Sequence, residues 1–290
     1  MSEKFTIKQF HERYPDDDSC LQKLFDERFG GLDVCPNCQK PAKFHRIKTR
    51  RRYDCQFCAY QLHPTADTIF HKSSTSLKNW FFAIWLFSNS KNGVSAKELE
   101  RHLGVTYKTA WRMAKQIRLL FADQDQDGEL LNDIVEADET YIGGKQKGKR
   151  GRGAANKTPV IGIAERDGEV KAIVAENTKA STIIPFIKEN VEQGSEVMTD
   201  EYLSYTSVSM NGFQHSTINH SSGNYVNGII HTNTIEGFWS QLKRSINGTY
   251  HSVSPKYLQS YVDEFAFRYN LRHSSQHLFQ VLLPVAAKLV

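Results

Sequence analysis

Two pairs of cysteines have the spacing of a metal site. Cys35 and Cys38 form one Cys-x2-Cys pair, and Cys55 and Cys58 form a second pair after sixteen intervening residues. Two residues between thiolates let both sulfurs of a pair reach one ion, and two pairs complete a tetrahedron. Because four thiolates leave no open coordination position, we expect a structural Zn²⁺. The alternative is a set of redox-active or unpaired cysteines.

Three carboxylates could form a second metal site, one that supports a reaction. Asp138 lies within a predicted strand, Asp200 ends another, and Glu236 lies near the start of a predicted helix. Two carboxylates bind Mg²⁺ weakly, and a third completes a two-metal site for phosphodiester chemistry. Plainer interpretations are that Asp200 merely ends its strand and that Glu236 completes a capping box with Asn233.

A basic residue accompanies the third acid. Glu236 and Lys243 are seven residues apart, which is nearly two helical turns, so both point to the same face of the helix. Lys243 could therefore contact the phosphate of a bound DNA end. Three neighbouring acids, Glu136, Glu139 and Glu201, are the residues most easily confused with the metal-binding carboxylates.

The elements that must position these acids have a definite order. Asp167-Gly168 is a strong hairpin signal between the second and third strands. A three-stranded meander, a helix, a strand, and then a strand and two helices is the ribonuclease H-like order, in which Asp138 and Asp200 come together. The predicted strands are 134–142, 160–164, 170–175, 196–199 and 213–218, and the predicted helices are 179–191, 234–247 and 255–272.

A helical region before these strands has the pattern of a DNA-binding motif. The helix predicted at Leu77–Asn89 carries a core stripe, and Ser95 caps a second helix that ends at Gly104. A third helix, Thr106–Phe121, completes a helix-turn-helix. The residues expected to contact DNA bases are those at its start, namely Thr106, Tyr107, Lys108 and Arg112. An ordinary pair of antiparallel helices is the alternative.

Basic residues are concentrated although the formal net charge is only +5. The segments 40–52, 106–121 and 143–157 hold seven, four and six basic residues and no acid. Such blocks favour a polyanionic partner, and solvated loops are the alternative. The residues expected to contact DNA phosphates are Arg50, Arg51 and Arg52 beside the cysteines, and Lys145, Lys147, Lys149, Arg150 and Arg152 in the last segment.

Composition limits the class of protein. The 290 residues include 17 Phe, 12 Tyr and 4 Trp, too many for a disordered chain. Apolar runs are far shorter than the ~20 residues of a membrane span, and the N-terminus has no signal region, so we expect a cytoplasmic protein, nucleoid-associated when bound to DNA. The expected divisions are an N-terminal helical segment 1–31, a zinc ribbon 32–62, a helix-turn-helix 76–121, a linker 122–132 and a catalytic domain 133–290.

Five segments together resemble the DDE transposases of bacterial insertion sequences that carry a zinc ribbon before the catalytic domain. They are CPNC…CQFC, ADETYIGGK at Asp138, TDEY at Asp200, HTNTIEGFWSQLKR at Glu236, and the downstream GTYHSVSPKYLQSYVDEFAFRYN. The resemblance implies a multi-domain α+β protein with a ribonuclease H-like α/β catalytic domain. It also implies Mg²⁺ or Mn²⁺ bound by Asp138, Asp200 and Glu236, with Lys243 as the associated basic residue. Some members of the group have Asn as the third ligand, which makes Asn233 the alternative to Glu236.

The expected function is DNA transposition. The helix-turn-helix and the ribbon would recognise inverted repeats at the transposon ends, and the catalytic domain would cut the DNA and join it to a target. Because two ends of double-stranded DNA must be joined, we expect at least a homodimer on DNA. Two alternatives are a catalytically silent, transposase-derived DNA-binding regulator and a ribonuclease H-like nuclease that cuts without joining.

Overall fold

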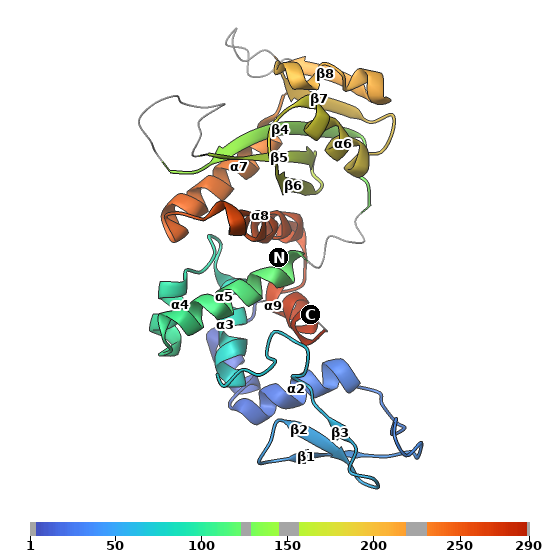
Figure 1. The fold of residues 1–290 in the computed structure, drawn as a ribbon, viewed down its shortest axis with the longest axis vertical. Helices are drawn as coiled ribbons and strands as arrows, with labels where there is room; N and C mark the ends of the chain where they lie inside the picture. Colours follow the sequence, from blue (N-terminus) through green and yellow to red (C-terminus); the bar gives the residue numbers. More distant parts are fainter. Residues whose placement is uncertain (1–3, 123–128, 145–156, 219–230, 289–290) are drawn as a thin grey trace. The chain divides into compact units, whose positions relative to one another are not determined.

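The computed structural model describes residues 4–122, 129–144, 157–218 and 231–288 (Figure 1). The chain divides into two compact units, one formed by Met1–Leu120 with Ser274–Val290 and the other by Phe121–His273. The basic residues predicted at 145–152 lie outside the described residues. Among the described residues, no helix is both long enough and apolar enough to cross a membrane.

The first unit combines helices with a small sheet. Its antiparallel sheet has the order β1-β2-β3. The elements are α1 (Ile7–Arg13), α2 (Asp17–Phe29), β1 (Phe44–Ile47), β2 (Arg52–Cys55), β3 (Gln61–Leu62), α3 (Leu77–Asn89), α4 (Ala96–Leu103), α5 (Tyr107–Ala122, which runs into the second unit) and α9 (Leu278–Ala287).

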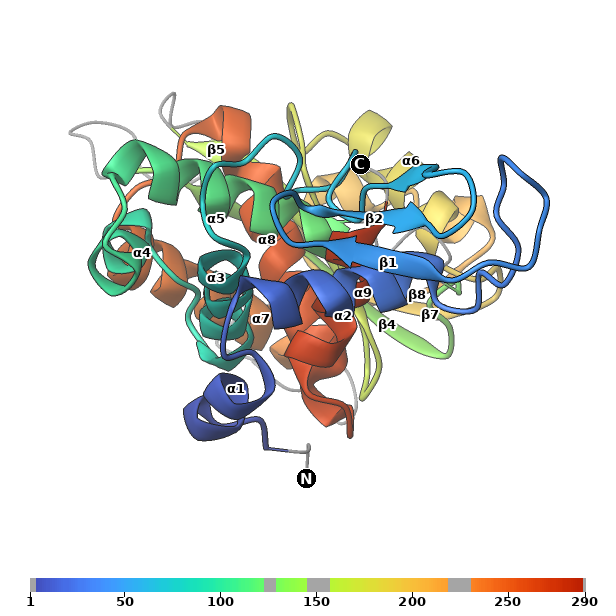
Figure 2. The same cartoon turned by 90° about the horizontal axis from the view of Figure 1, so that it is seen from below.

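Helix α2 packs against the small sheet, beside which it lies in Figure 2. The rings of Phe25 on α2 and Tyr53 on β2 have centroids 4.1 Å apart. The Tyr53 hydroxyl donates to Gln22 of the helix at 2.9 Å. The predicted boundary between residues 31 and 32 lies between α2 and this sheet, and the two share a core. The sheet needs α2 because it is too small to bury Tyr53 by itself.

The two helices predicted around Gly104 are present as α4 and α5. The Ser95 hydroxyl accepts the backbone N–H of Glu98 at 3.1 Å, which begins α4. Gly104 has φ of 62°, a left-handed conformation that glycine adopts without steric cost, and this ends α4. The Thr106 hydroxyl accepts the backbone N–H of Thr109 at 3.3 Å, which caps α5.

The C-terminal helix α9 belongs to the first unit. Phe279 on α9 is buried, and its ring centroid lies 5.1 Å from that of Phe5 and 5.8 Å from that of Tyr14. The sequence-based division assigned residues up to 290 to the catalytic domain, whereas the structure places residues from Ser274 onward with the N-terminal helices. The physical reason is that the apolar face of α9 completes the aromatic core of α1 and α3.

The second unit is built on a five-stranded sheet of order β6-β5-β4-β7-β8. Strands β4, β5 and β6 form an antiparallel meander, whereas β7 runs parallel to β4 and to β8. The elements are β4 (Ile134–Ile142), β5 (Thr158–Glu165), β6 (Val170–Val174), α6 (Ala180–Asn190), β7 (Glu196–Asp200), η1 (Leu203–Tyr205), η2 (Ser209–Asn211), β8 (Gln214–Ile218), α7 (Asn233–Ser245), η4 (Ile246–Tyr250), α8 (Pro255–Asn270) and η5 (Leu271–His273).

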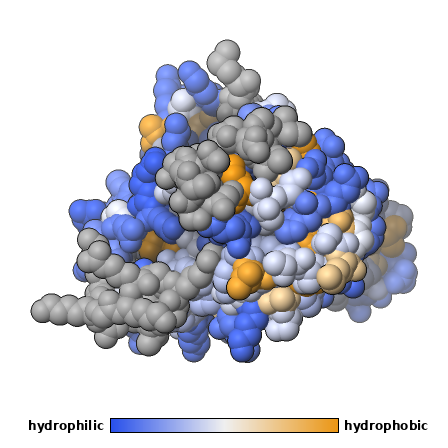
Figure 3. Space-filling model, turned by 90° about the horizontal axis from the view of Figure 1, so that it is seen from above, coloured by the Kyte–Doolittle hydropathy of each residue, from blue (hydrophilic) through white to orange (hydrophobic). Residues whose placement is uncertain are grey.

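Each face of this sheet has its own apolar core, and Figure 1 shows helices on both faces. Val135 and Ala137 of β4 pack with the buried face of α6, including Ile183 and Ile187. Residues of α7 and α8 pack with Val160 on the opposite face. On the face of the molecule seen in Figure 3, apolar residues are scattered among hydrophilic ones rather than gathered into one patch. Because side chains alternate along a strand and Val135 and Ala137 face α6, the even-numbered residues Glu136 and Asp138 lie on the side of α7.

Candidate active site

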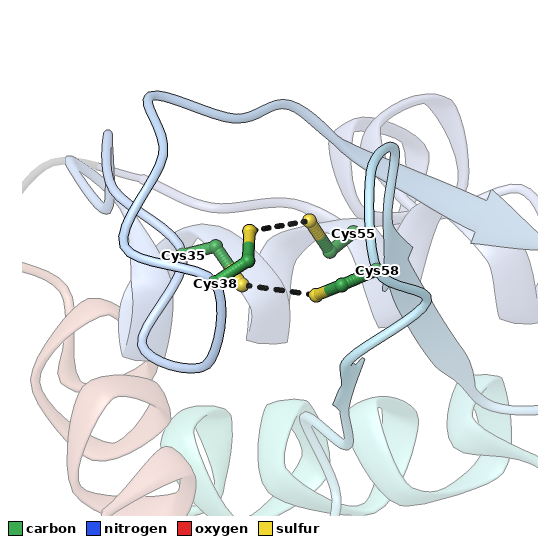
Figure 4. A group of neighbouring side chains, drawn as sticks. All are labelled: Cys35, Cys38, Cys55 and Cys58. Atoms are coloured by element: carbon green, nitrogen blue, oxygen red, sulfur yellow. Dashed lines mark hydrogen bonds between the residues drawn. The ribbon is translucent and has the colours of Figure 1, made fainter.

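The four predicted zinc ligands come together. The sulfurs of Cys35, Cys38, Cys55 and Cys58 all lie within 4.8 Å of one another and point toward a common centre (Figure 4). The Cys35–Cys58 and Cys38–Cys55 sulfur pairs are 3.6 and 4.0 Å apart. These distances bracket the ~3.8 Å expected between sulfurs around a tetrahedral ion with Zn–S bonds of about 2.3 Å. The residues present therefore fit Zn²⁺.

The two cysteine turns have matching backbone geometry. The N–H of Gln39 donates to the carbonyl of Cys35, and the N–H of Ala59 donates to that of Cys55. Asn37 donates to the Cys58 sulfur at 3.5 Å. This bond is the largest cause that lowers the pKa of the Cys58 thiol to about 6. A lowered pKa favours the thiolate, which is the form that binds metal.

Asp138 and Asp200 lie on neighbouring parallel strands. The register of β4 and β7 pairs Glu136 with Met198. Both aspartates are two residues further along, so they stand side by side at the same level of the sheet. The backbone N–H of Tyr202 donates to Oδ1 of Asp200 at 2.9 Å, which orients that carboxylate where β7 ends. The effect of the Asp200 charge on the pKa of Asp138 agrees with this placement.

Asp138 is surrounded by negative charge. Burial, followed by the neighbouring carboxylates Glu139, Asp200 and Glu236, raises the pKa of Asp138 to about 7. Desolvation and like charges both disfavour ionisation of a carboxyl group, and a bound cation relieves both. The carboxylates from β4, β7 and α7 thus form one electrostatic cluster of hard oxygen donors, which suits Mg²⁺ or Mn²⁺.

Glu236 and Lys243 both act on Asp138 from α7. Desolvation lowers the pKa of Lys243, while the charges of Asp138 and Glu236 oppose that shift and Lys157 adds to it. Lys157 stands directly before β5 and brings a second cation to the site. The prediction that Glu236 and Lys243 point to one side of the helix agrees with these couplings. Asn233, the alternative ligand, lies exposed at the first position of α7.

The carboxylate cluster is more open than the cysteine cluster. Of the residues that the structure describes, only the four cysteines bring three or more donor atoms within 4.8 Å of one another. Glu236 is exposed, and its Oε1 accepts the Thr232 hydroxyl at 2.8 Å. An exposed glutamate has rotamer freedom, so the carboxylate of Glu236 can change its direction.

Glu136 has a role that the sequence did not reveal. Its fully buried carboxylate accepts the backbone N–H groups of Thr234 and Ile235, at 2.7 and 3.1 Å. Arg166 donates to the same carboxylate at 3.0 Å, and His231 lies 3.1 Å away. Glu136 thus caps α7 across 98 residues of chain. The alternation of β4 could have indicated that Glu136 shares the face of Asp138.

Glu139 and Glu201, two acids that neighbour the proposed metal ligands in the sequence, lie in different surroundings. Glu139 is buried on the opposite face of β4, where it accepts the hydroxyl of the fully buried Tyr205 at 3.1 Å. Glu201 is exposed directly after β7. A further contact missed by sequence reasoning comes from Trp239, whose indole N–H donates to Oδ2 of Asp138 at 3.1 Å.

Several predicted DNA-contacting arginines have partners within the first unit. Arg51 donates to the carbonyls of Ser73 and Thr75 and to Asp17. Arg52 pairs with Asp54 at 3.0 Å. Arg112 donates to the Ser73 hydroxyl at 3.0 Å, with its guanidinium 5.5 Å from the Trp80 ring centroid. These side chains support the packing of the unit.

Other predicted DNA contacts are exposed. Arg50 lies in the turn between β1 and β2, and Thr106, Tyr107 and Lys108 lie at the start of α5. Lys97 of α4 lies 5.1 Å from the Tyr107 ring centroid, which adds positive charge to this end of the helix. Among the lysines and arginines predicted to contact DNA in this unit, Arg50 and Lys108 are therefore exposed, whereas Arg51 and Arg112 are partly buried.

Two family models match the chain. The ISXO2-like transposase domain matches residues 130–270, and the transposase zinc-ribbon domain matches residues 15–61. The first range contains the five-stranded sheet with Asp138, Asp200 and Glu236, and the second contains all four clustered cysteines. The protein is of the transposase class. It belongs to the insertion-sequence transposases that combine an ISXO2-like domain with an N-terminal zinc ribbon.

Two curated relatives support this assignment. An uncharacterised protein in transposable element ISH50 of Halobacterium salinarum is 28% identical over 254 residues, which is 81% of this chain and 84% of the relative. An uncharacterised transposase-like protein of Haemophilus influenzae is 31% identical over 107 residues, covering 35% of this chain and 81% of the relative.

Among solved structures, the Mos1 strand transfer complex matches 70% of this chain and 74% of its own, with 10% identity and a TM-score of 0.29. A simian T-cell lymphotropic virus intasome matches 69% and 71%, with 16% identity and a TM-score of 0.33. TM-scores this low do not define a shared fold, so the family assignment rests on the sequence matches.

Proposed function

We propose that this chain cuts DNA at the ends of an insertion sequence and joins the freed ends to target DNA. The observation that carries the proposal is the arrangement of the acids: Asp138 and Asp200 follow register partners on neighbouring parallel strands, and the start of α7, which carries Glu236, is bonded to the same strand. The charges of Asp200 and Glu236 both act on Asp138, and Lys243 lies on the same side of α7 as Glu236. Acids from two parallel strands and a helix, next to a lysine, are the groups that metal-dependent phosphodiester transfer needs. The meander with two further parallel strands supports a ribonuclease H-like domain as the scaffold.

The reaction has two similar displacements at phosphorus. A water molecule attacks the phosphodiester at the transposon end, and the departing oxygen leaves as a 3′-OH. That 3′-OH then attacks a target phosphodiester in line, and the displaced 3′ oxygen of the target strand leaves. Mg²⁺ or Mn²⁺ held by Asp138, Asp200 and Glu236 would supply activation of the attacking oxygen and stabilisation of the leaving one.

The side chains around the acids orient the DNA. Lys243 places positive charge beside Asp138, where the scissile phosphate must lie, and Lys157 adds a second positive charge near Lys243. Burial of Asp138 excludes water from one side of the site, which strengthens these interactions. Because Asp200 is fixed by the Tyr202 N–H, the two aspartates keep their spacing through both displacements.

Recognition of the DNA sequence is proposed for the first unit, and contacts to the DNA backbone for both units. We infer that α4 and α5 act as a helix-turn-helix, with Thr106, Tyr107 and Lys108 at the major groove of the inverted repeat. Arg50 of the zinc ribbon and the segment that contains Lys145, Lys147, Lys149, Arg150 and Arg152 would contact the phosphate backbone, which adds affinity with little sequence specificity. Joining two ends requires at least a dimer of this chain on DNA.

A joining assay with purified protein tests the proposal. Labelled transposon-end DNA, a target plasmid and Mg²⁺ should yield joined product with the wild-type chain and none with Asp138→Asn, Asp200→Asn or Glu236→Gln. Glu201→Gln is the matched control, because Glu201 is exposed beside Asp200. Cleavage without joining would instead support a nuclease, and specific DNA binding without cleavage would support a silent regulator.

A further inference from the structure

Trp239 touches the central acid of the proposed site. Its indole N–H donates to Oδ2 of Asp138 at 3.1 Å. The ring itself is 97% buried, because it packs in the core between α7 and the sheet with Ile235 and Leu242. A buried ring has one rotamer, so the direction of its N–H is fixed by packing.

Gly162 provides the space that this contact needs. Gly162 on β5 is the register partner of Asp138 on β4. A Cβ atom at position 162 would lie 2.6 Å from two carbons of the Trp239 ring and 3.1 Å from Ile235. Real Cβ atoms do not approach so closely, so any side chain at 162 would displace the indole from Asp138. The hydrogen bond from Trp239 and the absence of a Cβ atom at position 162 therefore both allow the indole to lie against Asp138.

Helix α7 brings the indole to Asp138 in a fixed relation to the other groups of the site. Glu236, Trp239 and Lys243 follow one another at spacings of three and four residues, which places them along one side of the helix. The start of this helix is held to β4 by Glu136, two residues from Asp138. The hydrogen bonds between Glu136 of β4 and the start of α7 thus help to fix the distance from the indole to Asp138.

We propose that Trp239 is a positioning residue for the metal site: its N–H holds Oδ2 of Asp138 so that Oδ1 is presented to the divalent cation. This inference rests on the proposed function. A carboxylate that accepts an N–H bond at one oxygen loses rotational freedom and favours coordination through the other oxygen. A neutral donor such as indole orients the carboxylate without competing with the cation for charge.

The first test measures metal affinity rather than activity. Mn²⁺ binding to the full-length, zinc-loaded chain is measured by electron paramagnetic resonance of the free ion. Trp239→Phe keeps a buried ring but removes the donor, and should weaken Mn²⁺ binding by about 10–100-fold. Gly162→Ala should weaken it as well, because the indole is displaced. Trp111→Phe is the control, since Trp111 lies exposed on α5 in the first unit and should leave the affinity unchanged.

The second test needs no substitution at the ring. The chain has four tryptophans, so four indole N–H signals are expected in the NMR spectrum of the ¹⁵N-labelled wild type. One of them should move when Mg²⁺ is added, and the same signal should be displaced in Asp138→Asn and no longer respond. A merely structural Trp239 would not give a signal that depends on both Asp138 and the metal.

The outcomes separate this inference from the proposed function. Wild-type affinity for Mn²⁺ no greater than that of Asp138→Asn would overturn the proposed function together with this inference. Tight binding that Trp239→Phe retains, or a metal titration that moves no indole signal while Asp138-dependent binding persists, would overturn the positioning role alone.

Discussion

The carboxylate of Glu136 accepts the backbone N–H of Thr234 at 2.7 Å, which joins the middle of β4 to the first turn of α7. The same strand carries Asp138 two residues later, and the same helix carries Glu236 two residues later. One buried hydrogen bond therefore sets the separation of two of the proposed metal ligands. This relationship explains how the backbone of a strand that carries one acid and that of a helix that carries another, far apart in sequence, keep a fixed spacing.

Removing this carboxylate should loosen the start of α7. Glu136→Ala leaves the Arg166 charge and two helix N–H groups buried without their partner, a loss of about 3–5 kcal/mol for a broken buried pair. Hydrogen exchange should accelerate at Thr234 and Ile235. Glu192→Ala, which removes an exposed acid of the same unit, should leave these amides protected. Unchanged protection in Glu136→Ala would show that the cap does not hold the helix.

The raised pKa of Asp138 predicts how divalent cations affect stability. The folded chain retains this proton up to a pH of about 7, whereas an unfolded aspartate releases it near 3.8. Without a divalent cation, this group therefore costs stability increasingly as the pH rises from about 4 to 7. Mg²⁺ should raise the thermal unfolding temperature above pH ~7 and have little effect near pH ~5, where the proton occupies the carboxyl group.

Thermal unfolding of the zinc-loaded chain, with and without Mg²⁺ at both pH values, checks this dependence. Asp138→Asn should remove the effect of Mg²⁺, because the neutral amide neither titrates nor binds the cation strongly. An equal effect of Mg²⁺ at both pH values would contradict the assignment of the titrating group.

The cysteine cluster predicts about one zinc per chain. Cys58→Ser should lose that zinc and unfold the ribbon, because metal binding supplies the folding free energy of so small a module. Elemental analysis together with circular dichroism measures both effects. Cys20→Ser is the matched control, since Cys20 is buried in α2 outside the cluster and its loss should leave the zinc content unchanged. Full zinc content in Cys58→Ser would refute the four-sulfur site.

The exposed start of α5 predicts a particular DNA-binding defect. Lys108→Ala should weaken binding to the inverted repeat and reduce the slope of log affinity against log salt by about one, because one positive charge that faces the DNA is lost. Fluorescence anisotropy at several salt concentrations measures this slope. Lys8→Ala on α1 provides an exposed lysine for comparison, with 86% of its side chain accessible. An unaltered slope in Lys108→Ala would place the DNA elsewhere.

Sequence patterns were sufficient where a residue's role depends on local spacing. The strand at Ile134–Ile142 and the helix at Leu77–Asn89 have the bounds that alternation and periodicity predict. The two cysteines of each pair are close because only two residues separate them, and the hairpin of β1 and β2 brings the two pairs together. The pairing of Asp138 with Asp200 could also be predicted, because strand order determines it.

Roles that depend on tertiary partners could not be predicted in this way. Charge along the sequence does not show that Arg51 and Arg112 are used within the fold, since three of their acceptors are carbonyl and hydroxyl groups at 73–75. An apolar run near the C-terminus does not show which unit it completes, and α9 belongs to the first unit rather than to the predicted catalytic domain. The contact of Trp239 with Asp138 depends on the absence of a side chain at Gly162, which no periodicity reveals.

The position of Mn²⁺ in crystals of this chain bound to transposon-end DNA tests the proposed metal site most directly. The anomalous scattering of Mn²⁺ should give two peaks about 3.5–4 Å apart, bounded by the carboxylates of Asp138, Asp200 and Glu236. If no Mn²⁺ peak lies beside these three acids, or if the peaks lie against Asn233 or Glu139 instead, the three acids do not form the catalytic metal site.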